Sequence, residues 1–173
     1  DAQVGGHEPH VARGPLLKAG VYGDRRTHAA HYAPTAFIIF VRALCQSGDL
    51  AAIDALVKQL DPQGLRAVPV YVASLRDPVC AETVRRIIGE AKPEVILNTT
   101  AFATTKPGDD AAGGILGEFG CPVLQVVLSS ENQAGWADGT RGLSARDIAM
   151  HVALPEVDGR ILTRAISFKA DAV

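Results

Sequence analysis

The stretch AFIIFV at residues 36–41 decides how the rest of the chain is interpreted, because it is an unbroken run of apolar residues. A compact run of this kind is typical of a strand that is buried on both faces. Strands buried in this way occur in parallel sheets whose two faces are covered by helices. We therefore predict that residues 36–41 form a buried strand.

The residues that follow alternate between helical and strand patterns. Apolar residues recur at helical spacing over 50–60, and Ser47 or Asp49 is the expected cap of that helix. Valines alternate with their neighbours over 67–73, which predicts a second strand, although Pro69 makes it a marginal one.

The pattern continues to the end of the chain. Asp77-Pro78 begins a second helix, since Asp is a favoured cap and Pro suits a first turn. Further strands are predicted over 94–98, 122–128 and 160–168, and a helix over 144–152. Alternating strands and helices indicate a parallel sheet with helices on both faces.

The fold class is therefore α/β, a parallel-sheet, flavodoxin-like or Rossmann-like layered domain over residues 35–173. Residues 1–34 are rich in Gly, Pro, His and Ala without a sustained period, and we interpret them as an irregular lead-in or linker. Residues 99–120 are too long for a simple connector, and loops of that length are usually functional or disordered. The chain begins with Asp1 rather than Met, so we expect it to be a fragment of a larger subunit.

Composition excludes several classes of protein. The formal net charge of -2 lacks the basic excess of a nucleic-acid-binding domain, so we expect no nucleic acid as partner. The apolar runs are too short to cross a bilayer, so no membrane span is expected. Three widely spaced cysteines are typical of reduced thiols, which favours the cytoplasm. Neither GxxxxGK[ST] nor GxGxxG after a strand occurs, so the chain is not expected to hydrolyse ATP itself.

Polar residues follow two of the predicted strands, at the edge where parallel sheets bind ligands. Asn98 and Thr99 come directly after one strand, and residues 129–132 (SSEN) follow the next. These clusters have the composition of a binding crevice, and they equally suit helix caps and turns.

Several side chains are candidates for chemistry. Glu156 and Asp158 stand in a predicted turn between Pro155 and Gly159, where they are either solvated turn residues or rigid carboxylates that attract a divalent cation and accept protons. Arg42, at the end of the first strand, suits a ligand carboxylate or a surface salt bridge equally.

The other candidates have simpler explanations. His151 is more often a structural residue than a ligand. Trp136 and Arg141 flank a loop and form either a pocket wall or packing contacts. The pairs His7/His10 and His28/His31 have metal-binding spacing but lie in the lead-in without further ligands, which favours solvated side chains.

Four blocks of the sequence carry a family resemblance: VILNTTAF at 95–102, PVLQVVL at 122–128, TRGLSARDIAMHVALPEVDGRI at 140–161 and ISFK at 166–169. They resemble the large, tetrapyrrole-binding subunits of aerobic cobaltochelatase and magnesium chelatase. The third block is long, ordered and compositionally specific. The continuation Arg160-Ile161 and the Ser-Phe-Lys ending look like the cobalt branch.

The resemblance implies a function. The large subunit would bind the corrin precursor hydrogenobyrinic acid a,c-diamide and Co2+ for cobalt insertion in cobalamin biosynthesis. AAA+ motor and adaptor subunits would hydrolyse ATP with Mg2+. The alternatives are a fragment of a magnesium chelatase large subunit and a non-catalytic tetrapyrrole-binding module of the same fold. With 173 residues, the fragment alone is expected to be inactive.

Residue roles carry over onto matching positions. Glu156 and Asp158 become the expected catalytic residues, because a glutamate of the Pro-Glu-Leu-Asp-Gly element is implicated in insertion; here Val157 replaces the Leu. Glu156 and His151 are the expected metal contacts. The expected substrate contacts are Arg42, Asn98, Thr99, Arg141 and His151.

Overall fold

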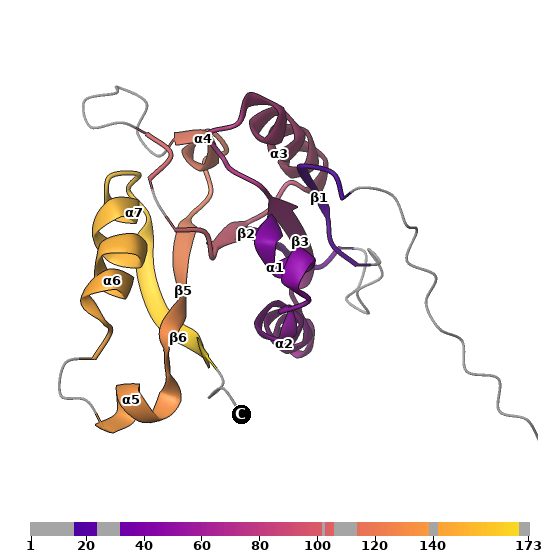
Figure 1. The fold of residues 1–173 in the computed structure, drawn as a ribbon. Coiled ribbons are helices and arrows are strands. Elements are labelled where there is room, and N and C mark those ends of the chain that lie inside the picture. The colour runs from indigo at the N-terminus through magenta and orange to yellow at the C-terminus, as the bar shows by residue number, and fades with distance from the viewer. Residues whose placement is uncertain (1–15, 24–31, 102, 106–113, 139–141, 170–173) are drawn as a thin grey trace, which may run out of the picture.

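The apolar run becomes strand β2 (Thr35–Val41), which lies inside a six-stranded sheet of order β1-β3-β2-β4-β5-β6 (Figure 1). The structure, a computed structural model, describes residues 16–23, 32–101, 103–105, 114–138 and 142–169. Parallel neighbours flank β2: β3 (Arg66–Val72) on one side and β4 (Val95–Asn98) on the other. Every residue of β2 before Val41 is buried, so the predicted doubly covered strand is confirmed.

The other strands extend the sheet on both sides. β5 (Val123–Asn132) pairs in parallel with β4, and β6 (Ile161–Lys169) pairs in parallel with β5 through an irregular register. At the opposite edge, β1 (Ala19–Val21) pairs antiparallel with β3. The expectation of an irregular segment before residue 35 is therefore wrong at β1. A strand of three residues is too short to show a period, and only its pairing with β3 defines it.

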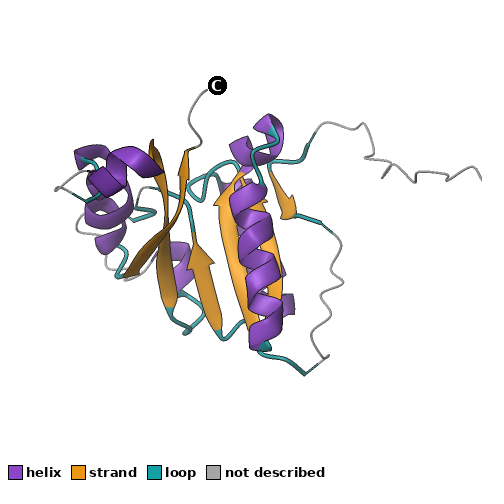
Figure 2. Ribbon diagram, turned by 90° about the horizontal axis from the view of Figure 1, so that it is seen from below, coloured by secondary structure: helices purple, strands orange, loops and turns teal. Residues whose placement is uncertain are grey.

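Helices cover both faces of the sheet, as the alternating pattern predicts. α2 (Ala51–Leu60), followed by a 3-10 turn (Asp61–Gln63), covers the face to which Ala36 and Ile38 point. α3 (Pro78–Ala91) covers the opposite face, where Phe37 and Ile39 are buried (Figure 2). The two-residue alternation of β2 thus divides its side chains between two apolar layers.

The starts of the two helices differ in how well the sequence predicts them. Asp77 accepts hydrogen bonds from the amides of Val79 and Cys80, which confirms it as the cap of α3. Neither predicted cap serves α2, because Ser47 ends an additional helix, α1 (Arg42–Ser47), and the amide of Asp49 bonds back to Leu44.

The carboxyl-terminal part carries short helices: α4 (Gly114–Gly117), α5 (Gln133–Asp138), α6 (Ala145–Ile148) and α7 (Leu154–Glu156). A π turn (Ala149–Ala153) joins α6 to α7, so the helix predicted over 144–152 continues to Glu156. Glu156 consequently ends a helix instead of lying in a turn, which corrects the prediction. Pro155 lies directly after the π turn, at the start of α7.

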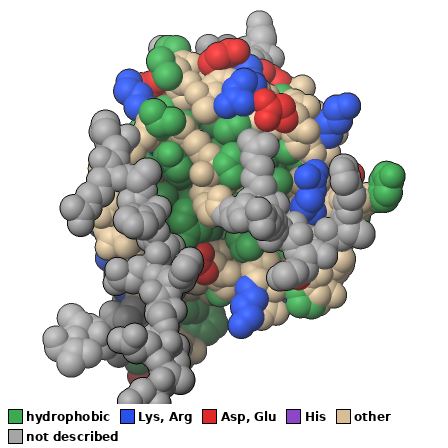
Figure 3. Space-filling model, turned by 90° about the vertical axis from the view of Figure 1, so that its right-hand side faces the viewer, with side chains coloured by type: hydrophobic (Ala, Val, Ile, Leu, Met, Phe, Trp, Pro, Cys, Tyr) green, Lys and Arg blue, Asp and Glu red, His purple; other side chains and the backbone are tan. Residues whose placement is uncertain are grey.

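Charges on the surface are mixed in sign. Figure 3 shows acidic and basic side chains interleaved along the upper part of one face. On α3, Arg85 bonds to Glu118 and Arg86 to Glu90, each with a shortest N–O distance of 2.7 Å. Within the described ranges, no helix has the length and apolarity needed to cross a membrane.

Candidate functional site

A pocket of about 340 Å3 opens at the carboxyl ends of β2, β3 and β4. The chain leaves β2 for β3 on one side, then returns to β4 on the other, so these strand ends form the switch point of the sheet. Ligands of open α/β sheets bind at such points. The lining residues are Val41, Val72, Ala73, Ser74, Leu75, Arg76, Thr100, Ala101, Ala103 and Thr104.

The loop that follows β4 forms one wall of this pocket, and buried amide side chains fix its start. Asn98 donates from Nδ2 to the carbonyl of Thr100 (3.1 Å) and to Oε1 of Gln125 (2.8 Å). Its Oδ1 accepts from the amide and the hydroxyl of Thr100. Gln125 in turn donates from Nε2 to the carbonyl of Thr100 (3.0 Å). These bonds leave the beginning of the loop little freedom.

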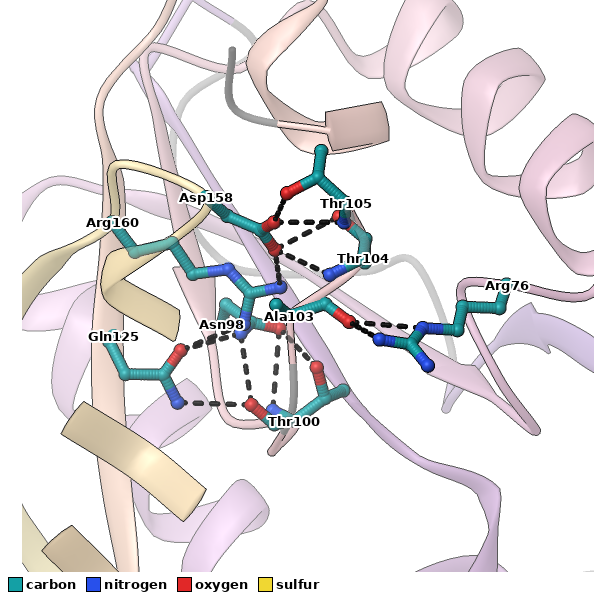
Figure 4. Close-up of polar contacts among 9 residues, drawn as sticks. All are labelled: Arg76, Asn98, Thr100, Ala103, Thr104, Thr105, Gln125, Asp158 and Arg160. Carbon is teal, nitrogen blue, oxygen red and sulfur yellow. Dashed lines mark hydrogen bonds and ion pairs between the residues drawn. The ribbon is translucent and has the colours of Figure 1, made fainter. Parts of the chain in front are cut away.

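Asp158 holds the end of the same loop. Its carboxylate accepts from the amides of Thr104 (2.7 Å) and Thr105 (3.0 Å), and from both threonine hydroxyls (Figure 4). It also pairs with Arg160 at 2.6 Å, where the side chains are 0% and 1% exposed. Burial acts to raise the pKa of Asp158, but the hydrogen bonds and the guanidinium outweigh it and lower that pKa. The carboxylate is therefore charged and fully engaged.

Arg76 anchors the loop from the opposite side of the pocket. Its Nε and Nη2 both donate to the carbonyl of Ala103, at 3.1 and 2.7 Å (Figure 4). The loop is thus held by Arg76 on one side and by Asp158 on the other. We call residues 98–101 and 103–105, the described part of the segment that includes these contacts, the clamped loop.

Glu156 stands two residues before Asp158, at the end of α7, and is exposed. The amide of Gly159 bonds to the carbonyl of Glu156, and Gly159 has a φ of 65°, which closes the helix in the left-handed conformation that glycine adopts readily. The Asp158 anchor therefore fixes the backbone that carries Glu156. An exposed carboxylate on a fixed backbone is able to accept protons or attract a cation.

His151 lies half-buried in the π turn that precedes α7. Its Nδ1 is buried and has no hydrogen-bond partner among the described residues. Burial lowers the pKa of His151, against the opposing effect of the Asp147 charge, so the imidazole is neutral at neutral pH.

Asp147 is a buried residue that the sequence analysis missed. It accepts from the hydroxyls of Ser129 (2.7 Å) and Ser130 (2.8 Å), and thereby ties α6 to β5. Burial acts to raise its pKa, but these hydrogen bonds hold the pKa below its usual value. Ser129 and Ser130 were expected to follow the strand, but they lie within β5 and bond to Asp147, so they serve the structure.

The expected substrate contacts have different surroundings from those anticipated. Asn98 and Thr99 are buried and bond within the protein, Thr99 through its hydroxyl to the carbonyl of Ile39 (3.1 Å), so they shape the clamped loop instead of facing a ligand. Arg42 begins α1, half-buried, with an Nε that has no partner among the described residues. Arg141 lies outside the described residues, as do the pairs His7/His10 and His28/His31.

Two other expectations concern side chains around the site. The ring of Trp136 contacts that of Phe168, with centroids 5.1 Å apart, so it has at least a packing role. Glu156 and His151 were expected to contact metal, but the described residues contain no group of three or more His, Cys, Asp or Glu side chains placed to hold an ion. These two residues are therefore not part of a complete protein-only metal site there.

The sequence indicates some of the residues that the sequence analysis missed better than others. Gln125 is a polar residue inside the apolar run 122–128, and a buried amide implies a hydrogen-bonded partner. Arg160 follows Asp158 within the resembling block, yet nothing local shows that it is buried. Arg76 gives no signal, because its partner Ala103 is 27 positions away.

Comparison with known proteins is consistent across sequence and structure. A family model described as CobN/Magnesium Chelatase matches residues 13–173. The chain is 43% identical to the aerobic cobaltochelatase subunit CobN of Sinorhizobium sp over 187 residues, covering 98% of this chain and 15% of that protein. It is 39% identical to the CobN subunit of Pseudomonas aeruginosa, covering 79% of this chain and 11% of that protein.

The fold is also similar to a solved structure, the catalytic subunit of cobaltochelatase from Mycobacterium tuberculosis. The TM-score is 0.74 at 30% identity, over 90% of this chain and 14% of that one. The chain thus spans about one seventh or less of the length of these relatives. Since the family model covers nearly the whole sequence and the identity to CobN is high, this chain belongs to the CobN/magnesium chelatase family.

Proposed function

We propose that this chain supplies part of the insertion site of a cobaltochelatase large subunit, which binds a corrin precursor and Co2+. The observation that carries the proposal is the pair Glu156 and Asp158. Asp158 is buried and bonded to the clamped loop, while Glu156, two residues earlier, is exposed on backbone that this anchor fixes. The relatives named cobaltochelatase subunits support the choice of reaction.

The chemistry of insertion suits an exposed carboxylate. The inner N–H proton of the corrin leaves as the ion enters the macrocycle, and Glu156 would accept it. In the expected pair of Glu156 and Asp158, we assign proton transfer to Glu156 and a positioning role to Asp158, because the Asp158 carboxylate already accepts four hydrogen bonds from threonines.

Metal delivery requires weak binding by the protein. The macrocycle offers four nitrogens to Co2+, and a complete protein site would compete with them. One carboxylate and one neutral imidazole, Glu156 and His151, form a partial ligand set from which the ion is readily released. The lowered pKa of His151 keeps the imidazole unprotonated and hence able to coordinate.

The remaining parts of the reaction belong to other residues and chains. We propose hydrogenobyrinic acid a,c-diamide as the substrate, with Arg42 and Arg141 as further contacts. AAA+ motor and adaptor subunits would hydrolyse ATP with Mg2+, in keeping with the lack of a P-loop here. The fragment alone would be inactive. A magnesium chelatase subunit is the second candidate, favoured by the shared family model.

The test is cobalt insertion by the full-length parent subunit with its motor partners, comparing the native protein with Glu156→Gln. We expect the rate of insertion to fall about a hundredfold or more, in the range of a lost general base, with tetrapyrrole binding retained. Glu82→Gln is the matched control, since Glu82 is 79% exposed on α3 and should have no effect. Unchanged insertion by Glu156→Gln would contradict the role of Glu156, and insertion of Mg2+ alone would favour the magnesium reaction.

A further inference from the structure

We propose that the pocket at the switch point binds a carboxylate side group of the tetrapyrrole through Arg76. The inference rests on the proposed function for the identity of the ligand. It adds a subsite between the β3–α3 connection and the clamped loop, with Arg76 of that connection as the contact residue. The subsite is defined by Ser74, Arg76, Thr100 and Thr104, all of which line the pocket.

The guanidinium of Arg76 has donors and a positive charge that are available to bind a ligand. It uses Nε and Nη2 on one neutral acceptor, the carbonyl of Ala103, and within the described ranges it has no ion-pair partner. A guanidinium carries five N–H donors, so three remain, including both on Nη1. Because Ala103 fixes one edge of the planar group, these donors are held in position before a ligand arrives.

The surroundings of Arg76 favour an anion over a cation. None of the residues lining the pocket is acidic. The nearest carboxylate in the sequence, Asp77, is engaged elsewhere: it caps α3 and accepts from Nζ of Lys18 at 2.8 Å. The positive charge of Arg76 is therefore not balanced by a described carboxylate.

The rest of the pocket suits a small, partly apolar group that ends in an anion. Val41, Val72 and Leu75 form an apolar wall that suits the alkyl part of such a group, while Ser74 and Arg76 are exposed to solvent. The hydroxyl of Ser74 accepts from the amide of Arg76, and its own proton remains available to a ligand. A volume of about 340 Å3 is at the small end of ligand sites, which suits a carboxyalkyl arm of a macrocycle better than the macrocycle itself.

The pocket is mechanically joined to the anchor beneath Glu156. Thr104 lines the pocket, and its amide and hydroxyl both bond to Asp158. Figure 4 shows Arg76 and Asp158 bonded to neighbouring residues of the clamped loop, so a ligand arm held by Arg76 would lie against a loop that is also tied to the segment after Glu156. This arrangement would orient the macrocycle relative to the carboxylate that acts on it.

Binding by the full-length parent subunit, without metal or motor subunits, tests the subsite. The probes are the metal-free corrin acid of the proposed function and its derivative with the free carboxylates converted to carboxamides. For Arg76→Gln we expect affinity for the acid to fall about ten- to a hundredfold, with affinity for the carboxamide unchanged. The amide side chain of this variant can still donate to Ala103, so the substitution removes charge while leaving a loop contact possible. We expect Arg76→Lys to retain part of the affinity.

The controls separate the subsite from folding and from the proposed reaction. Arg86→Gln removes an exposed guanidinium on α3 that pairs with Glu90, and should bind both probes as the native protein does. If Arg76→Gln lowers the affinity for both probes equally, or for neither, the subsite is overturned. If Glu156→Gln inserts cobalt normally while Arg76→Gln weakens binding of the acid alone, the role of Glu156 is wrong and the subsite stands. No binding of the corrin acid by the native protein would overturn both.

Discussion

Glu156 and Asp158 are two positions apart and have opposite environments. Glu156 is exposed, whereas Asp158 is buried with a guanidinium and four threonine donors around it. An anion with this number of partners gains little from solvent, and it is unsuited to exchanging protons with a substrate. The same environment makes it an effective anchor for backbone. The division of labour between the two carboxylates therefore follows from burial.

The pH dependence of stability tests this anchor. The folded pKa of Asp158 is lower than the ordinary aspartate value of about 3.9, so its stabilisation is complete above that value and is lost as pH falls towards the folded pKa. Asp158→Asn leaves Arg160 as a buried charge without its partner, and should lower the free energy of unfolding at pH 7 by about 3 kcal/mol. Urea unfolding from pH 7 to pH 2.5 is the measurement.

Asp138→Asn is the control, because Asp138 is exposed at the end of α5. The Asp158→Asn protein should also lose less stability than the native protein on acidification below about pH 4. Acidification will still lower the free energy of unfolding of Asp158→Asn to some extent, since Asp147 also has a lowered pKa. If the free energy of unfolding falls with pH in parallel for the native and Asp158→Asn proteins, Asp158 is not a charged anchor.

At the scale of elements, β5 connects the two polar parts of the site. Gln125, near the start of this strand, accepts from Asn98 (2.8 Å) and from Nη1 of Arg160 (3.1 Å) through one amide oxygen. It thus links the clamped loop after β4 to the start of β6. The strand order places β5 between these two elements, so one side chain reaches both.

Gln125→Leu should therefore loosen the clamped loop. The substitution leaves buried donors of Asn98 and Arg160 without this acceptor, and we expect a loss of about 2–4 kcal/mol in the free energy of unfolding. Hydrogen exchange should increase most at the amides of Thr100, Thr104 and Thr105. The exposed control is Gln46→Leu on α1. Unchanged protection of these threonines would contradict the coupling.

At the scale of the whole molecule, β6 is notable for apolar exposure. Ile161, Leu162 and Ile166 are 54%, 47% and 46% exposed, and within the described residues β6 has a strand neighbour, β5, on one side alone. An open strand edge with apolar side chains promotes association between chains. We therefore expect the isolated segment to self-associate through β6.

Sedimentation velocity across a range of concentrations measures this association. Leu162→Lys together with Ile166→Lys should shift the isolated segment towards monomer, because charge on an edge strand opposes pairing. Val79→Lys is the control, since Val79 is also apolar and exposed but lies on α3. A segment that stays monomeric without substitution, or one that associates equally with the β6 lysines, would contradict the expectation.

Local patterns in the sequence were sufficient for the main elements. The apolar run at 36–41 has no polar position, which requires cover on both faces and hence a strand inside a layered α/β fold. Asp77-Pro78 predicts the start of α3 because a cap and a first-turn proline act within a few residues. The resembling block 140–161 identified the family, which the comparisons confirm.

The tertiary structure alone decided which polar residues meet. Thr104 and Asp158 are 54 positions apart, and Asn98 and Gln125 are 27 apart. Their contact depends on the strand order and on the path of the clamped loop, neither of which leaves a periodic signal in the sequence. Local chemistry therefore determined the strands, the helix caps and the exposed Glu156. The environment that makes Asp158 an anchor and gives Arg76 an open pocket arises only when distant segments pack, because burial and hydrogen-bond partners are properties of the folded chain.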